Sequence, residues 1–242
     1  MQHTKLSSAG TLAAVSLFTA LTLLGTSVLR IPTPTFGYVH LGDCFVLLAG
    51  LLLGPVYGGL AAGIGSALAD LLAGYVVWVP GTFMIKFLTA AAAALLFRRL
   101  QNAAQTVSQR QVHKALQTQA GRHLHNAAQA LLQSQAQNNP DSETVLPPNT
   151  DPEKSRSVSG SARMFLLAAV CGELVMTAGY FLYNILVVSL FSSTAGTGLL
   201  AAASLSLAEI PFNLVQGAAG IVLAAVLYPV FSRSLLRTLM PG

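Results

Sequence analysis

Long apolar segments with almost no charge run through most of this chain. They lie at about 11–29, 43–54, 56–72, 79–97, 164–191 and 206–231. About 20 consecutive apolar residues let a helix cross the hydrocarbon core of a bilayer. Charged residues make up 9% of the chain, whereas an ordinary soluble domain has about 25%. We therefore expect an all-α integral membrane protein with six transmembrane helices.

The stretch 43–72 has two interpretations. The sequence "LLLGPVYGGL" contains a Gly-Pro pair, Gly54 and Pro55, that is typical of a turn. In the first interpretation the turn separates two helices, of which the first is short. In the second, the stretch is one helix broken at the same point.

Residues 99–162 differ in composition from the apolar parts on either side. Within 101–160 the chain has ten Gln and five Asn. The earlier, Ala- and Gln-rich half is compatible with a surface helix, whereas the later half is rich in Pro, Ser and charge and predicts disorder. We expect one membrane domain, 1–98 with 163–242, interrupted between helices 4 and 5 by a polar, largely disordered cytoplasmic linker at 99–162.

The distribution of Lys and Arg predicts the orientation in the membrane. Eight of the thirteen lie between Arg98 and Arg163, and the termini add Lys5, Arg233 and Arg237. Because positive loops stay in the cytoplasm, both termini and the long loop are predicted to be cytoplasmic. Six spans agree with that parity. The net charge of +5 is thereby explained by orientation, and no nucleic-acid partner is expected.

Half of the acidic residues fall in or at the edges of the apolar segments: Asp43, Asp70, Glu173 and Glu209. Charge at membrane depth costs about 2.5 kcal/mol or more and tends to mark function. Lys86 also lies within a span, so a structural ion pair with Glu173 or Glu209 is the alternative to a role in binding. Asp43 is predicted to cap a helix N-terminus, and Asp70 to bond to the neighbouring loop. Both are therefore predicted to be structural.

Two of the segments carry polar residues at helical spacing. The fifth has Glu173, Thr177, Tyr180 and Asn184, and the sixth has Glu209, Asn213 and Gln216. Steps of three and four residues place each group on one helix face. We expect both faces to point inward in the outer half of the membrane, where they pair with each other or with a ligand.

Aromatic residues gather in the outer connections: Phe36, Tyr38, His40, Tyr75 and Trp78. Taken singly, Tyr and Trp are typical anchors at the membrane interface. As a set beside inward polar faces, they favour a pocket lined by rings, with a few polar groups fixing orientation.

The sequence has no catalytic signature. It lacks H-E-x-x-H, a G-x-S-x-G with a histidine at membrane depth, and the phosphate-binding G-x-x-x-x-G-K-[ST]. We expect no enzyme activity, no cofactor and no metal site. Transport driven by ATP would need partner subunits that hydrolyse it.

Five motifs together resemble a known family: "RIPTPTFGYVHLGD", "GPVYGGLAAGIGSALADLLAGY", "VPGTFMIKFLTA", "GELVMTAGYFLYN" and "AEIPFNLVQGAAGI". They are similar to the substrate-binding S components of energy-coupling factor (ECF) transporters, and to the riboflavin-type group among them. The similarity covers roughly 10–98 and 163–232. It implies six helices, an outward-facing vitamin site, a transmembrane coupling subunit and two cytoplasmic ATPases. The implied location is a bacterial or archaeal cytoplasmic membrane.

The resemblance also implies site residues. The carried-over pocket positions are Tyr38, Tyr75, Trp78, Lys86, Glu173, Tyr180, Asn184, Asn213 and Gln216, to which the patterns above add His40 and Glu209. Small residues on the first helix would contact the coupling subunit, here Ala13, Ser16 and Ala20. The chain departs from the family in its long insert and in His40, where asparagine is expected.

The expected function is capture of a small heteroaromatic vitamin or precursor from the outer face. Vitamin B6 or a pyrimidine is the first choice of ligand and riboflavin the second. A stand-alone proton-coupled secondary transporter using Glu173 or Glu209 is the alternative, although the halves show no inverted repeat. An intramembrane enzyme and a purely structural assembly factor are further alternatives.

Overall fold

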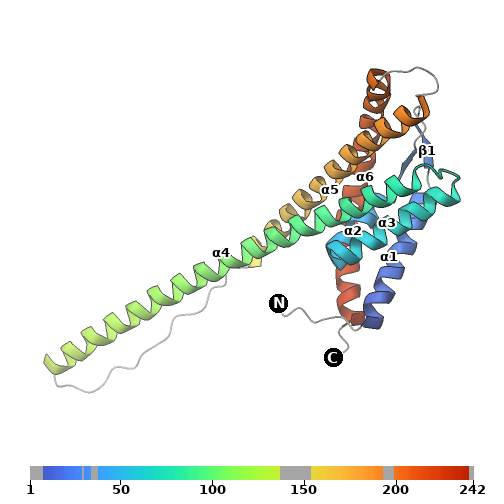
Figure 1. Cartoon of the computed structure of the whole chain (residues 1–242). Coiled ribbons are helices and arrows are strands. Elements are labelled where there is room, and N and C mark those ends of the chain that lie inside the picture. Colours follow the sequence, from blue (N-terminus) through green and yellow to red (C-terminus); the bar gives the residue numbers. More distant parts are fainter. Residues whose placement is uncertain (1–7, 29, 34–37, 137–153, 193–198, 240–242) are drawn as a thin grey trace. The chain divides into compact units, whose positions relative to one another are not determined.

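The computed structural model describes residues 8–28, 30–33, 38–136, 154–192 and 199–239. Within these ranges the chain forms α-helices and one pair of short strands (Figure 1). Their bounds are α1 Ser8–Val28, β1 Arg30–Pro32, β2 Tyr38–His40, α2 Asp43–Leu53, α3 Pro55–Leu72, α4 Val79–Ala136, α5 Lys154–Ser192 and α6 Leu199–Leu239.

Five of the helices are long and apolar enough to cross a membrane: α1, α3, α4, α5 and α6. Helix α2 has 11 residues, so at about 1.5 Å per residue it reaches only about half of a 30 Å hydrocarbon core. The chain is therefore a multi-pass, all-helical membrane protein. Helix length alone does not confirm the predicted count of six transmembrane helices.

The stretch 43–72 forms two packed helices and not one broken helix. Gly54 links them with φ of 90°, a conformation that glycine adopts at little cost. Pro55 follows at the start of α3, where its missing N–H is harmless. Gly58 lies against the carbonyl of Ala49, and a Cβ there would clash with it. The Gly-Pro pair thus reverses the chain direction, and glycine allows the two helices to approach closely.

A short antiparallel hairpin, absent from the sequence prediction, connects α1 to α2. Strand β1 pairs with β2 so that Arg30 faces His40 and Pro32 faces Tyr38. Strands of three residues leave little signal in a sequence. This hairpin places Tyr38 and His40 beside the helices.

The described residues divide into two compact units, 1–98 with 162–242 and 99–161. In the second unit, residues 99–136 continue α4 as a helix whose side chains are mostly exposed. Ala and Gln are good helix formers, and a membrane helix that is already formed removes the cost of nucleation. Residues 137–153, which hold most of the stretch predicted to be disordered, lie outside the described residues.

Within the first unit, apolar packing and polar residues occupy opposite ends of the same helices. In α4, Phe97 belongs to the main hydrophobic core, whereas Thr82 lines a cavity. In α5, Phe165 is in the core and Asn184 lines the cavity. The core thus holds the helices together at one end and leaves the cavity at the other.

Candidate functional site

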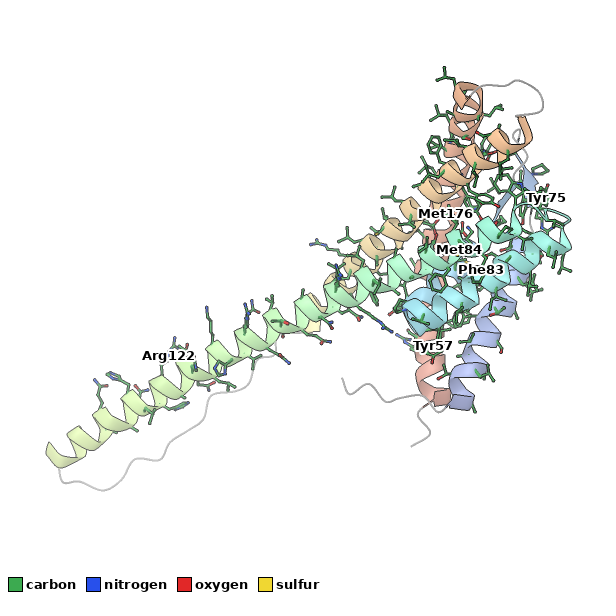
Figure 2. The ribbon with its side chains drawn as sticks, in the orientation of Figure 1. Tyr57, Tyr75, Phe83, Met84, Arg122 and Met176 are labelled. Carbon is green, nitrogen blue, oxygen red and sulfur yellow. The ribbon has the colours of Figure 1, made fainter. Side chains whose placement is uncertain are left out.

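A cavity at one end of the first unit collects polar and aromatic side chains. It has about 610 Å³ of atom-free space, counting the part that opens to solvent. Figure 2 shows one of its residues, Tyr75, in the turn between α3 and α4, and Tyr57 near the opposite end of α3. Its lining residues are Thr26, Tyr38, His40, Asp70, Tyr75, Trp78, Thr82, Tyr180, Asn184, Glu209, Asn213 and Gln216.

Most residues that were predicted to bind substrate line this cavity, and the exceptions are Lys86 and Glu173. Asp70, predicted to be structural, also lines it. Phe36 lies outside the described residues. The sequence prediction missed Thr26 and Thr82. Thr82 precedes Lys86 by one helical turn, and this spacing was the available signal.

Lys86 is paired with Asp43 inside the protein. Its Nζ donates to Asp43 Oδ1, and both side chains are fully buried. The Nζ also lies 3.0 Å from Met176 Sδ. The two alternatives from the sequence, an ion pair of Lys86 with Glu173 or with Glu209, are therefore wrong. Because the chain leaves β2 directly into the protein interior, α2 begins with Asp43 facing α4.

Asp43 does not cap α2, although the sequence suggested it. The N-cap residue is Gly42, and no side chain caps this helix end. Asp43 is the first helical residue instead, where the helix dipole favours a carboxylate. Its second oxygen, Oδ2, accepts a hydrogen bond of 2.6 Å from Gln216 Nε2.

A chain of hydrogen bonds connects this ion pair to the cavity wall. The His40 backbone N–H donates to Gln216 Oε1 at 3.0 Å, and the Gly42 N–H donates to His40 Nδ1 at 3.0 Å. His40 Nδ1 is thus an acceptor and carries no proton. Burial lowers the pKa of His40 to about 4, because an apolar surrounding disfavours the charged ring. His40 therefore lines the cavity as a neutral group.

Tyr38 and Asp70 form a second polar pair in the cavity wall. The Tyr38 hydroxyl donates to Asp70 Oδ1 at 2.5 Å. Burial, and then the nearby Asp70 carboxylate, raise the pKa of Tyr38, so its hydroxyl keeps the proton that it donates. The carboxyl group of Asp70 therefore bonds to β2. The neighbouring loop contacts Asp70 through its backbone: the N–H groups of Ala73 and Tyr75 donate to the Asp70 carbonyl at 3.2 and 2.9 Å.

Aromatic rings surround these polar groups. The ring centroid of Tyr38 lies 5.2 Å from that of Tyr75 and 5.5 Å from that of His40. Trp78 lines the cavity and packs against Tyr183, which does not line it; their ring centroids are 5.6 Å apart. Tyr180 lines the cavity, and Lys86 Nζ lies 5.3 Å from its ring centroid. Flat apolar walls with polar groups between them suit a planar ligand.

Two buried glutamates occupy different positions. Glu209 lines the cavity, and its Oε1 accepts a hydrogen bond of 2.8 Å from the Thr33 hydroxyl. Glu173 is 6% exposed and does not line the cavity. Neither of its carboxyl oxygens has a hydrogen-bond partner in the described part of the chain. Gly217 packs directly against this side chain.

The small residues of α1 face away from the protein core. Ala13, Ser16 and Ala20 are exposed, whereas Ala14 and Phe18 on the same helix are buried. The exposed face is separate from the cavity lining. The predicted contact of these residues with a coupling subunit remains a prediction.

Comparisons with known proteins bear on this arrangement. In the curated set, 62 residues are 47% identical to a protein of Pyrococcus woesei described as an uncharacterized protein in a gap 3' region. That match covers 25% of this chain and 41% of the relative, so it spans less than half of the relative's length.

Among solved structures, the S component of a bacterial ECF transporter matches with a TM-score of 0.50. The match covers 95% of this chain and 99% of the solved one at 17% sequence identity, a level that bears on the fold alone. Residues 6–121 also match the family model described as ECF-type riboflavin transporter, S component. The resemblance that the five motifs indicated is confirmed: residues 6–121, slightly less than half of the chain, are similar to the ECF-type riboflavin transporter S components.

Proposed function

We propose that this chain is the vitamin-capturing S component of an ATP-driven ECF importer. Members of this family are transport subunits that bind substrate and are not enzymes, so ATP hydrolysis is assigned to partner subunits. The observation that carries the proposal is the cavity: rings, amides and carboxylates from both halves of the sequence converge in one membrane unit.

The cavity lining supports a small heteroaromatic ligand. Tyr38, Tyr75 and Trp78 offer faces for stacking, while Asn184 and Asn213 offer amide groups to the polar edge of a ring. Vitamin B6 or a pyrimidine precursor is the first candidate and riboflavin the second.

The topology proposed is six membrane segments with both termini and the insert in the cytoplasm. Tyr38, just before α2, bonds to Asp70, near the end of α3. The chain therefore enters and leaves the α2–α3 hairpin on the same side of the membrane. Counting the short α2 as one of six membrane segments is compatible with both termini lying on one side.

The partners proposed are a transmembrane coupling subunit and two cytoplasmic ATPases. The exposed small residues of α1 support close packing of a partner helix there. We expect Ala20→Phe to abolish ATP-dependent uptake and leave ligand binding intact. Ala225→Phe is the control, because Ala225 is an exposed small residue of α6. Equal uptake by both variants would contradict the proposal that α1 contacts the coupling subunit.

The direct test is to identify small molecules that co-purify with the detergent-solubilised protein by mass spectrometry, and then to titrate the emptied protein. Trp78 is the only tryptophan of the chain and lines the cavity, so its fluorescence reports binding. We expect sub-micromolar binding of one vitamin, weakened about tenfold by Asn184→Leu as a lost buried hydrogen bond. Absence of such binding across the vitamins tested would refute the proposal.

Proton-coupled secondary transport is the second candidate, favoured by the buried carboxyl of Glu173, which has no hydrogen-bond partner among the described residues. It predicts uptake into liposomes driven by a pH gradient, without ATP or partners. Glu173→Gln would abolish that uptake. If uptake requires the ATPases and survives Glu173→Gln, this alternative is wrong.

A further inference from the structure

The charges that face the cavity all have one sign. Asp70 and Glu209 are carboxylic residues in its lining, and within the described residues no Lys or Arg lines it. The stretches 34–37 and 193–198, which lie outside the described residues, contain no Lys or Arg in their sequence. A cationic side chain from these stretches is therefore excluded.

The two cations nearest to the cavity are already engaged. Lys86 is fully buried in its ion pair with Asp43. Arg30 donates from Nε to the Thr26 carbonyl at 3.3 Å and from Nη2 to the Ala69 carbonyl at 3.4 Å. Its guanidinium also lies 5.3 Å from the centroid of the Tyr38 ring. Lys86 is therefore not available to pair with a ligand, and Arg30 is not part of the cavity lining.

The carboxylates are held in place by hydroxyl groups, which do not neutralise them. Tyr38 donates to Asp70, and Thr33 donates to Glu209. Asn184 lines the cavity and is 4% exposed. Its side-chain amide makes no hydrogen bond to another described residue. A buried amide without a partner is costly, so this group is placed for a ligand.

Carboxylates and aromatic faces attract the same kind of ligand. A cation gains from the negative face of Tyr and Trp rings and from nearby carboxylates. An anion beside two carboxylates, with no cation to pair with, is disfavoured. We propose that the cavity selects a heteroaromatic ligand carrying a protonated amine or a quaternary nitrogen, and rejects carboxylated and phosphorylated forms. This inference rests on the proposed function, because it specifies the charge of the ligand in the same cavity.

The experiment compares ligands of different charge by Trp78 fluorescence and equilibrium dialysis. The panel has two cations (pyridoxamine and thiamine), two neutral compounds (pyridoxine and riboflavin) and two anions (4-pyridoxic acid and flavin mononucleotide). We expect one of the cations to bind about tenfold or more tighter than the neutral and anionic members.

Two variants assign the preference to the carboxylates. Glu209→Gln and Asp70→Asn keep hydrogen-bonding groups but remove charge, so each is expected to weaken binding of the cation about tenfold. Both should weaken binding of the neutral ligands clearly less than they weaken binding of the cation, because only the cation loses a charge interaction. Arg163→Gln, which removes an exposed charge outside the cavity lining, is the matched control and should change neither. Melting temperatures verify folding, and Glu209→Gln decides if Asp70→Asn does not fold.

The outcomes separate the two proposals. Binding of a neutral or anionic member as tightly as the cations overturns the charge preference and leaves the proposed function standing. A cation preference that survives both carboxylate variants also overturns the inference. Absence of binding by every member of the panel overturns the proposed function, and the inference with it.

Discussion

The position of Lys86 separates a structural role from a binding role. Its charge is buried against Asp43, so removing it leaves a buried carboxylate unpaired. We expect Lys86→Met to lower the free energy of unfolding by about 3–5 kcal/mol. The double variant Lys86→Met with Asp43→Asn should recover most of that loss, because no charge is then left unpaired. Thermal unfolding in detergent measures both effects.

A contrasting result would restore the sequence prediction that Lys86 binds substrate. If Lys86→Met melts like the parent protein but no longer binds the vitamin, Lys86 contacts the ligand directly. Gln216, which donates to Asp43, offers a further check. Gln216→Leu removes this buried hydrogen bond and should lower the free energy of unfolding by about 1–3 kcal/mol.

The neutral state of His40 makes stability depend on pH. Its pKa in the folded protein is about 4, below the ordinary value of 6.5. Between these two pKa values the unfolded chain binds a proton at His40 that the folded chain does not. The contribution of His40 to stability is therefore complete above pH 6.5 and is lost as the pH falls from 6.5 toward 4. From about pH 7.5 to about pH 5 we expect a loss of about 2 kcal/mol.

The matched control for this pH dependence is His40→Asn, whose side-chain oxygen can still accept from the Gly42 N–H. Parallel melting curves of the parent and His40→Asn across the same pH range would show that His40 does not titrate as described. The charges of Asp43 and Lys86 also affect the pKa of His40. The parent protein and the His40→Asn variant must therefore both keep Asp43 and Lys86 unchanged.

The sequence identified the polar positions better than their partners. Helical spacing was sufficient to place Tyr180, Asn184 and Asn213 around one cavity. The pairing of Lys86 with Asp43 could not be predicted from the sequence, because it depends on where the β1–β2 hairpin positions Asp43. A period along one helix carries no information on which side chain of another helix it meets.

Among the secondary-structure elements, the α2–α3 hairpin is the most sensitive to side-chain volume. A Cβ at Gly58 would collide with the backbone of α2 at Ala49, and backbone atoms cannot rotate away. We expect Gly58→Ala to destabilise the protein by about 1–3 kcal/mol. Gly121→Ala, where nothing lies within 4 Å, should be neutral or stabilising by up to about 1 kcal/mol. Equal melting temperatures for the two variants would contradict this packing.

The elements were predictable where one physical signal dominates. Apolar length correctly located α1, α3 and the membrane part of α4. It did not show how far α4 continues, because exposed Ala and Gln carry no periodicity to mark a helix end. The strands β1 and β2 have three residues each, and their pairing depends on tertiary contacts that such short stretches do not encode.

At the scale of the whole molecule, the separation of core and cavity explains how a membrane protein can keep an open site. The main hydrophobic core includes Phe18, Leu47 and Phe97, and it anchors α1, α2 and α4. Their polar ends then need little packing among themselves. The cost of the buried charges is offset by ion pairing and hydrogen bonds within the same unit.

The same separation predicts that the long insert is dispensable for binding. Every residue in the cavity lining belongs to the unit formed by 1–98 and 162–242, and none belongs to 99–161. Replacing 99–161 by a Gly/Ser linker of about 20 residues, which behaves as a flexible coil, should change vitamin affinity by less than about twofold. Fluorescence titration of Trp78 measures this affinity. Because the two proposed ATPases are cytoplasmic, like the proposed location of the insert, any effect of the replacement should appear in uptake. A large loss of affinity in the isolated protein would show that the insert supports the cavity itself.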